Sequence, residues 1–276
     1  MSRNRRERFD RVFGGTSPVL GMIHLQALPG SPGFGGSLDA VIEHALRDVA
    51  TMVDGGVDAL IVENLHDAPY YPETTEPETV AAMAVCAREV VRQAGVPVGI
   101  NVLRNSWKAS LGVAAASGAD FIRLNILTDA MVTDQGIING AAHLVTRYRR
   151  AIGADDVLIM ADLLTKHAAP LVERPVPVIA GDMLDRGGAD AIILAGDDSS
   201  MPPSLSRVEI IKEAFPDAPV VLGSGMTAAV GEEYARVADG AVFGYGSKDE
   251  SDMARPVSAE LTGAFVRAWG SGRSAR

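Results

Sequence analysis

The chain has 276 residues, of which 47% are hydrophobic and 22% are charged, and its formal net charge is −10. This composition is typical of a globular protein with a sizeable core and excludes a mostly disordered chain. An acidic protein has no electrostatic reason to bind nucleic acid or an anionic membrane surface, so we expect neither partner.

Targeting and redox signals are weak throughout the sequence. The arginines at positions 3–11 are not followed by an apolar stretch, and no run reaches the ~18 apolar residues of a spanning helix. We therefore expect a soluble cytoplasmic protein without a transmembrane segment. The single cysteine, Cys86, falls in a helical stretch and is interpreted as a small buried hydrophobe rather than a catalytic thiol.

A phrase repeated along the chain organises the fold prediction. A helix-like segment ends near glycine, an aspartate or alanine follows, and a short apolar run begins. The copies are Gly55–Asn64, Gly118–Asn125, Gly187–Leu194 and Ala238–Gly244. Glycine supplies the left-handed conformation that ends a helix, and a short apolar run is typical of a strand buried on both faces.

Four further apolar runs bring the predicted strands to eight, namely Val19–His24, Val98–Val102, Val157–Asp162 and Val220–Gly223. The helical segments between strands are predicted at Leu38–Asp54, Thr79–Ala94, Trp107–Ser117, Ile138–Ile152, Ala168–Arg186, Leu205–Phe215 and Ala228–Val237. Strands that alternate with helices form a parallel sheet, and eight repeats favour closure over an open doubly wound sheet.

The predicted fold class is therefore α/β, a single (β/α)8 TIM barrel over residues 16–269. Residues 1–15 are expected to form a short helical arm under the barrel floor, and residues 270–276 a loose tail. In this fold the chemistry resides on the loops that follow the strands.

Glycine-rich turns follow the last two predicted strands. Such turns let backbone N–H groups converge on an anion, and a lysine adds a point charge. The predicted phosphate-binding residues are Gly223, Ser224, Gly225, Gly244, Gly246, Ser247 and Lys248. The amides of Ser224, Gly225, Gly246 and Ser247 are expected to face one concavity. The alternative is that the glycines only permit tight turns.

Strands one and two end in titratable residues. His24 precedes a long Gly/Pro-rich connection that is a candidate lid, and it is either a site acid or base or a packed histidine. Glu63 is a candidate general base or metal ligand, with a salt bridge in the barrel rim as its alternative.

The densest titratable set follows strand five, where Asp162, Lys166 and His167 are the remaining catalytic candidates. The chain has only four lysines, and three of them fall just after a predicted strand or its first turn, which favours a chemical role for Lys166 over a solvated loop position. Asn101, Arg123 and Asn125 at neighbouring strand ends are candidates for orienting substrate hydroxyls or phosphate, or else they bond one another across the barrel layers. Asn64 is a further candidate for binding substrate.

No metal motif of the HExxH or clustered Cys/His type is present, so no cofactor and no metal ligand are predicted. A divalent metal is left open, because several candidate ligands follow strands. They are His24, Glu63, His66, Asp67, Asp162 and His167.

Taken together, these motifs resemble the BtpA family (also called BtpA/SgcQ). The residues that carry the resemblance are Gly21–Leu25, Leu28–Pro32, Asp58–Asn64, Gly99–Asn105, Phe121–Asn125, Thr133–Gly136, Arg147–Arg149, Ala161–Asp162, Lys166–Ala168 and Gly223–Gly225. They spread from Gly21 toward Val257. The resemblance implies a TIM barrel related to the ribulose-phosphate-binding group. One departure is Gly244–Lys248, which reads Gly-Tyr-Gly-Ser-Lys where a Gly-Thr-Ser-Leu-Lys-like phrase is expected.

The resemblance implies two functions. Some family members are linked to photosystem I biogenesis, and others resemble proteins placed beside sugar-uptake genes with a suspected nucleosidase role. Our first hypothesis is an enzyme that cleaves or isomerises a small phosphorylated sugar or nucleoside-like compound. The second is a non-enzymatic assembly or stability factor for a membrane complex. We expect a homo-oligomer from the habits of such barrels.

Overall fold

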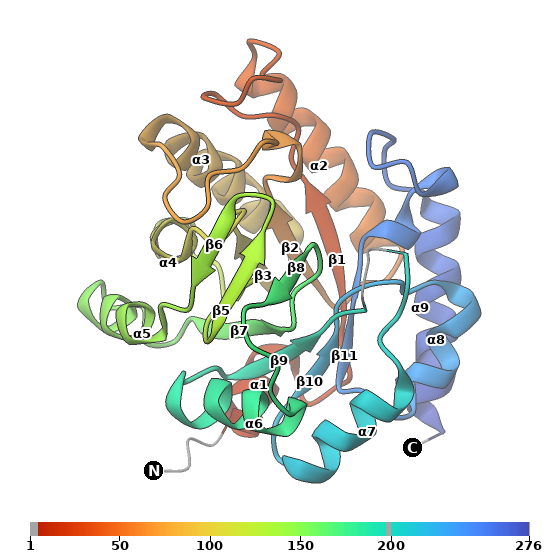
Figure 1. The fold of residues 1–276 in the computed structure, drawn as a ribbon. Helices are drawn as coiled ribbons and strands as arrows, with labels where there is room; N and C mark the ends of the chain where they lie inside the picture. The colour runs from red at the N-terminus through yellow and green to blue at the C-terminus, as the bar shows by residue number, and fades with distance from the viewer. Residues whose placement is uncertain (1–4, 197–199, 276) are drawn as a thin grey trace.

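Eight parallel strands close into a barrel in the computed structural model, which describes residues 5–196 and 200–275 (Figure 1). The barrel strands, in the order in which they neighbour one another, are β1 (Val19–His24), β2 (Ala59–Glu63), β3 (Val98–Asn101), β4 (Phe121–Leu124), β7 (Leu158–Leu163), β9 (Ala191–Leu194), β10 (Val220–Leu222) and β11 (Gly240–Phe243). Strand β11 pairs with β1, with Val19 opposite Ala241, and this pairing closes the ring. The predicted TIM barrel is confirmed.

Helices surround the strands on the outside (Figure 1). They are α1 (Arg5–Phe13), α2 (Leu38–Asp54), α3 (Pro77–Ala94), α4 (Trp107–Ser117), α5 (Ala142–Ala151), α6 (Val176–Gly181), α7 (Leu205–Ala214), α8 (Ala228–Ala235) and α9 (Ala259–Ser274). Local sequence sets their ends. Ser37 accepts a hydrogen bond from the Ala40 N–H at the start of α2, and Gly95 adopts a left-handed conformation (φ 65°) after α3.

A small antiparallel sheet is the feature that sequence reasoning missed. It consists of β5 (Ala130–Thr133), β6 (Gly136–Asn139) and β8 (Ala168–Pro170), in the order β6-β5-β8. The helix predicted to start at Ile138 therefore starts at Ala142, and the one predicted to start at Ala168 is a strand followed by α6. Short antiparallel strands occupy the start of both segments that were predicted to be helical.

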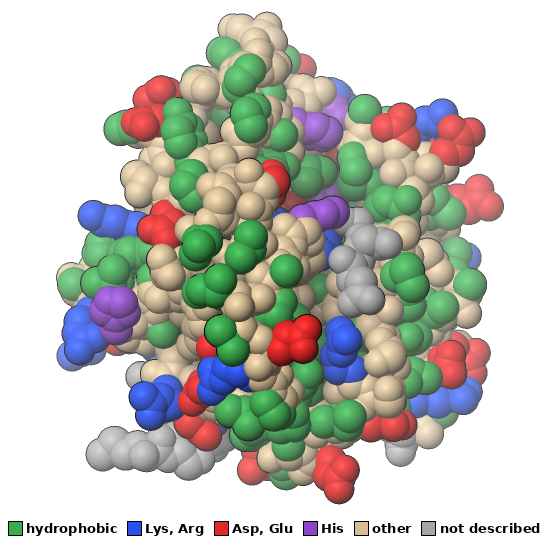
Figure 2. Space-filling view, viewed as in Figure 1, with side chains coloured by type: hydrophobic (Ala, Val, Ile, Leu, Met, Phe, Trp, Pro, Cys, Tyr) green, Lys and Arg blue, Asp and Glu red, His purple; other side chains and the backbone are tan. Residues whose placement is uncertain are grey.

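The small sheet has one buried and one exposed apolar face. Met131 and Ile138 pack with Ile126 on the buried face. The residues exposed on and beside the other face are Val132, Ile137, Leu171 and Val172. In Figure 2 hydrophobic side chains occupy the surface over this sheet.

The core has an inner and an outer layer. The inner layer fills the barrel with alternate strand side chains such as Leu20, Ile61 and Met160, and Phe9 and Phe13 of α1 close it from below. The outer layer packs the other strand face against the helices. Helix α1 thus forms the floor of the barrel.

The aspartate of the repeated phrase has a structural purpose at this floor. Each one accepts a hydrogen bond from a backbone N–H at the start of the preceding strand. The pairs are Asp58 with Val19 (2.8 Å), Asp120 with Val98 (2.9 Å), Asp190 with Ile159 (2.9 Å) and Asp239 with Val220 (2.9 Å). The repeat therefore joins neighbouring strands in four places around the floor.

The C-terminal segment differs from the expected loose tail. Helix α9 continues to Ser274, well beyond Trp269. Trp269 donates from Nε1 to the Ser17 carbonyl at 3.0 Å, and a Cβ on Gly272 would lie 2.1 Å from the Glu232 carbonyl oxygen. Close packing of α9 on α8 holds this segment in place.

Candidate active site

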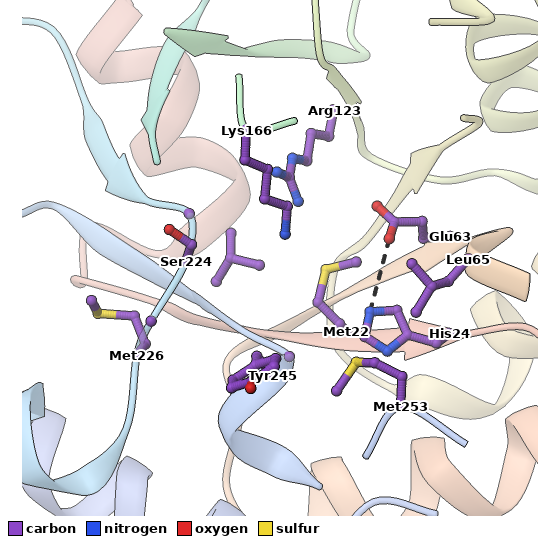
Figure 3. Close-up of a pocket in the computed structure, with 14 residues that line it drawn as sticks. Met22, His24, Glu63, Leu65, Arg123, Lys166, Ser224, Met226, Tyr245 and Met253 are labelled. Carbon is purple, nitrogen blue, oxygen red and sulfur yellow. Dashed lines mark ion pairs between the residues drawn. The ribbon is translucent and has the colours of Figure 1, made fainter. Parts of the chain in front are cut away.

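A cavity of about 150 Å³ opens at the C-terminal ends of the strands. One wall carries charged or titratable side chains: His24 ends β1, Glu63 ends β2, Arg123 belongs to β4 and Lys166 follows β7. In Figure 3 the ends of Lys166 and Arg123 lie together, and Glu63 lies beside His24. The barrel therefore brings together four candidates that lie up to 142 positions apart in sequence (Lys166 minus His24).

The opposite wall is glycine-rich backbone from the loops after β10 and β11. Gly223, Ser224, Gly225 and Gly244 all line the cavity. Gly225 has φ 63°, and a Cβ there would lie 2.1 Å from the Pro202 nitrogen, so only glycine fits. The Gly223 N–H donates to the Leu194 carbonyl at 2.8 Å, so this wall is closely packed backbone in which Ser224 and Gly225 are the candidates for holding an anion.

The second glycine loop is built differently from the prediction. The Ser247 N–H donates to the Gly244 carbonyl at 3.0 Å, and a Cβ on Gly246 would lie 2.3 Å from the Met226 carbonyl oxygen. Lys248 is buried, with its Nζ 3.1 Å from Asp48 of α2. The turn after β11 directs these residues away from the cavity, so Ser247 and Lys248 serve packing and an internal ion pair.

Ser224 has a partly structural position. Its hydroxyl accepts a hydrogen bond from the Gly196 N–H at 2.7 Å and donates to the Met201 carbonyl at 2.9 Å. The side chain joins the loops after β9 and β10, while its backbone remains on the cavity wall.

Asp162 is held by Arg123 rather than by Lys166. Arg123 Nε and Nη2 lie 2.9 and 3.0 Å from the two Asp162 oxygens, which also accept from Asn125 (2.9 Å) and Thr165 (3.0 Å). Burial disfavours the Arg123 charge, but the Asp162 carboxylate outweighs burial and raises the pKa of Arg123. Asp162 does not line the cavity; it positions Arg123, which does.

The predicted asparagines mainly bond within the barrel. Asn101 Nδ2 donates to Asn125 Oδ1 at 3.3 Å and to the Arg123 carbonyl at 3.2 Å. Asn64 donates to Asp67 at 2.9 Å and accepts from the Leu103 N–H at 2.8 Å. The alternative in which these amides bond one another or nearby groups describes them best, although Asn64 also lines a neighbouring pocket.

Burial shifts the pKa values of His24 at the end of β1 and Glu63 at the end of β2 in opposite directions. Burial raises the pKa of Glu63, with the positive charges of Arg123 and Lys166 acting in the opposite direction. Burial and the charges of Lys248 and Lys166 lower the pKa of His24 well below its usual value. His24 Nε2 lies 3.8 Å from Glu63 Oε1. The pair thus combines a neutral imidazole with a carboxyl group that retains its proton to a higher pH than usual.

Lys166 lies in a constrained turn. Leu164 (φ 59°) and His167 (φ 55°) are both left-handed, and Arg104 donates a hydrogen bond to the Lys166 carbonyl. Burial and the Arg123 charge lower the pKa of Lys166. His167 is exposed on the turn into β8 and does not line the cavity.

The connection after β1 packs on its surroundings rather than standing free. The Leu28 N–H donates to Asp67 at 2.7 Å, and Thr79 donates to the Pro29 carbonyl at 2.7 Å. Its function as a lid stays a prediction. Within residues 5–196 and 200–275, no three His, Cys, Asp or Glu side chains group together as metal ligands.

Several cavity-lining residues escaped sequence reasoning. They are Met22, Leu65, Met226, Val242, Tyr245 and Met253. Tyr245 lies within the glycine-rich phrase, and its place there was the available signal. Met253 comes from an irregular loop that no periodicity reports.

Comparison with protein families agrees with the resemblance noted in the motifs. The model of the BtpA family matches residues 15–270. The chain is 38% identical to the Photosystem I biogenesis protein BtpA of Synechocystis over 95% of this chain and 91% of that protein. It is also 38% identical to an uncharacterized protein of Pyrococcus abyssi, over 89% and 93% of the two chains.

Solved structures share the fold at low identity. The tryptophan synthase alpha chain of Legionella pneumophila has a TM-score of 0.60 at 13% identity, with 98% of both chains covered. N-(5'-phosphoribosyl)anthranilate isomerase of Pyrococcus furiosus has a TM-score of 0.55 at 15% identity, covering 91% of this chain and 98% of that one. In the part of the chain that the structure describes, no helix is both long and apolar enough to span a bilayer.

Proposed function

This chain belongs to the BtpA family, and we propose that it is an enzyme acting on a small phosphorylated sugar or nucleoside-like compound at the barrel mouth. The observation that carries the proposal is the composition of one cavity. Glu63, His24, Lys166 and Arg123 face a wall of peptide backbone across a space of about 150 Å³. An assembly factor that uses only its outer surface has no need for such a cavity.

The two walls suit different parts of a substrate. We assign the anion to the backbone of Ser224 and Gly225, because the Gly223 N–H already donates to the Leu194 carbonyl at 2.8 Å and glycine-rich turns bind phosphate without side chains. Arg123, fixed by Asp162 in two-point contact, adds a positive charge in a set orientation. The phosphate is therefore assigned to the glycine wall, and the reacting carbon to the side facing Glu63 and Lys166.

Glu63 is the proposed acid–base group. Burial raises its pKa, so it holds a proton to a higher pH than an exposed carboxyl group does, which suits a group that both gives and takes a proton. Both glycosidic cleavage and isomerisation need such a group, in the first case to protonate the leaving group and in the second to move a proton between carbons. His24, held neutral, stays beside Glu63 at 3.8 Å as an uncharged partner.

The test is turnover on a panel of pentose and hexose phosphates, nucleosides and nucleoside monophosphates. We expect at least one to be converted, and the Glu63→Gln variant to lose about a hundredfold in turnover because the proton is no longer exchanged. Glu89→Gln is the matched control, because Glu89 lies on the outer surface of α3. A panel without turnover, or equal turnover in Glu63→Gln, would count against the proposal.

A second candidate is an assembly factor, in keeping with the name of the Synechocystis relative. The observation that favours it is the exposed apolar face on and beside the small sheet, where Ile137 is 57% and Val172 is 68% exposed. The test asks which variants restore the growth of cells that lack this protein. Failure of the Ile137→Ser, Val172→Ser double variant to do so, with Glu63→Gln still active in this assay, would favour the assembly factor over the enzyme.

A further inference from the structure

Cations near the cavity differ in whether they already have a partner. Arg123 is bound in two-point contact to Asp162, and Lys248 is paired with Asp48 at 3.1 Å. Lys166 has no such partner, since no carboxylate within residues 5–196 and 200–275 lies within the 4.0 Å ion-pair distance of its Nζ. Its amine thus lines the cavity without an ion-pair partner from these residues.

The backbone around Lys166 is held in an unfavourable conformation. Residues with side chains rarely adopt positive φ, yet Leu164 and His167 on either side of Lys166 both do. Arg104 fixes the intervening carbonyl by a hydrogen bond. Backbone strain of this kind is concentrated at functional sites, where the surrounding structure maintains it. Here the constrained turn points Lys166 into the cavity (Figure 3).

The surroundings of the amine favour its neutral form. Burial and the adjacent Arg123 guanidinium both lower the pKa of Lys166, while Glu63 and Asp162 only partly oppose them. A desolvated lysine beside another cation is the setting in which a lysine amine becomes a nucleophile toward carbonyl carbon. Such an amine needs a nearby proton donor, and Glu63 lines the same cavity with a raised pKa.

We propose that Lys166 is the nucleophile of this site and forms an imine with the carbonyl carbon of an open-chain phosphorylated aldehyde or ketone. This inference rests on the proposed function and narrows its substrate class. The imine would act as an electron sink for proton transfer or for cleavage of the adjacent carbon–carbon bond, so it favours isomerase or lyase chemistry over glycosidic cleavage.

The covalent step balances without any further reagent. The lone pair on Lys166 Nζ attacks the carbonyl carbon, the C=O π electrons move to oxygen, and Glu63 supplies a proton to that oxygen. The nitrogen then loses a proton back to the Glu63 carboxylate. A second protonation of the hydroxyl by Glu63 releases water as the C=N bond forms. The products are water, a protonated imine and the Glu63 carboxylate, so the proton that leaves with the water comes from Glu63 and the positive charge stays on the imine nitrogen.

Reductive trapping tests the proposal directly, because the chain has only four lysines. The full-length protein is incubated at neutral pH with dihydroxyacetone phosphate, and separately with ribose 5-phosphate, in the presence of sodium cyanoborohydride. Peptide mass spectrometry then gives the rate of modification at each lysine. Reagent concentration is raised until exposed Lys108 is measurably modified, so every experiment has an internal reference.

We expect Lys166 to be modified about tenfold or more faster than Lys108, as an activated amine should be. Inorganic phosphate should slow modification of Lys166 and leave Lys108 unaffected. Lys166→Arg should abolish the fast adduct, whereas Lys108→Arg should retain it. Modification of Lys108 at the same rate as Lys166, or faster, would overturn the proposal, because a half-buried lysine that is not activated reacts more slowly than an exposed one.

The outcome is separable from that of the proposed function. Fast trapping at Lys166 with no turnover on the panel would support imine formation and count against the proposed enzymatic function on these compounds. Turnover that depends on Glu63, without preferential trapping at Lys166, would support the enzyme and overturn the lysine nucleophile.

Discussion

The floor and the mouth of the barrel both bury charged side chains, but they match those charges differently. At the floor, Asp190 has Arg8 at 2.9 Å and Arg149 at 3.0 Å, and Asp239 has Arg6 at 3.0 Å and Lys212 at 2.7 Å. At the mouth, the ion-pair contact of Glu63 is His24 at 3.8 Å, a histidine whose lowered pKa favours its neutral form.

We infer from this difference that the charges at the floor serve stability and those at the mouth serve chemistry. A buried charge with good partners resists removal, since the partner left behind has no solvent to stabilise it. A buried group without a close partner is a burden on the folded state that natural proteins keep mainly where function requires it. Substitutions at the floor should therefore lower stability, and substitutions at the cavity wall should lower activity.

The largest expected effect is at the floor. Asp190→Ala removes the acceptor of the Ile159 N–H and leaves Arg8 and Arg149 without their carboxylate. We expect a loss of about 3–5 kcal/mol in the free energy of unfolding, measured by urea denaturation. Turnover per folded molecule should stay unchanged.

The matched control is Asp155→Ala. Asp155 pairs with Arg150 at 2.7 Å, but both side chains are exposed, at 47% and 80%. An exposed pair contributes about 0–1 kcal/mol, so its loss should be small. Equal losses for Asp190→Ala and Asp155→Ala would contradict the structural importance of the floor.

The second effect concerns Asp162, which lies near the mouth but, like the floor aspartates, has a close arginine partner. Asp162→Asn removes the charge that holds Arg123, so we expect a loss of about 3 kcal/mol in the free energy of unfolding. Turnover should also fall because Arg123 loses its orientation. An Asp162→Asn variant with wild-type stability would show that Arg123 has another partner.

Sequence reasoning reached the barrel more completely than the site. All eight strands followed from short apolar runs, four of them in the repeated phrase, because buried parallel strands have this local signature. The repeated aspartate was noticed as a pattern, but its bonding to the preceding strand depends on a neighbour about 20–40 positions away, as with Asp190 and Ile159.

The site depends on side-chain directions that sequence order does not encode. Asp162, Lys166 and His167 were grouped because they are close along the chain. In the fold Asp162 turns to Arg123, His167 turns outward, and only Lys166 reaches the cavity. Lys248 was placed at the mouth for the same reason, although Asp48, two hundred positions earlier, holds it. Partners distant in sequence decided each case.

A third, smaller effect should have the opposite sign. Lys166→Met keeps an unbranched side chain and removes a charge that burial disfavours. We expect the variant to be about 1 kcal/mol more stable than the parent at neutral pH, and to lack activity. Differential scanning calorimetry measures the first and the substrate panel the second. A destabilised Lys166→Met would indicate that Lys166 has a structural partner after all.

The smallest effect is a pH dependence that reports on Glu63. Its pKa is raised in the folded state from an ordinary value of 4.5. Between the two values the folded state binds more protons than the unfolded state, so the contribution of Glu63 to stability falls as pH rises. Glu63→Gln has no carboxyl group to ionise, so its stability lacks this pH dependence. The difference in free energy of unfolding between Glu63→Gln and the parent protein should therefore grow in favour of the variant from pH 4.5 upward and level off above the folded pKa of Glu63. An advantage that does not change with pH, measured by urea denaturation, would contradict burial of the carboxylate.

The most direct test of the division between floor and mouth compares Glu63→Gln with Asp190→Ala in two assays, the free energy of unfolding and turnover per folded molecule. We predict that Glu63→Gln keeps or gains stability and loses about a hundredfold in turnover, while Asp190→Ala loses stability and keeps its turnover. A Glu63→Gln variant that unfolds as readily as Asp190→Ala, or that turns over substrate at the parent rate, would contradict the assignment of the cavity as the active site.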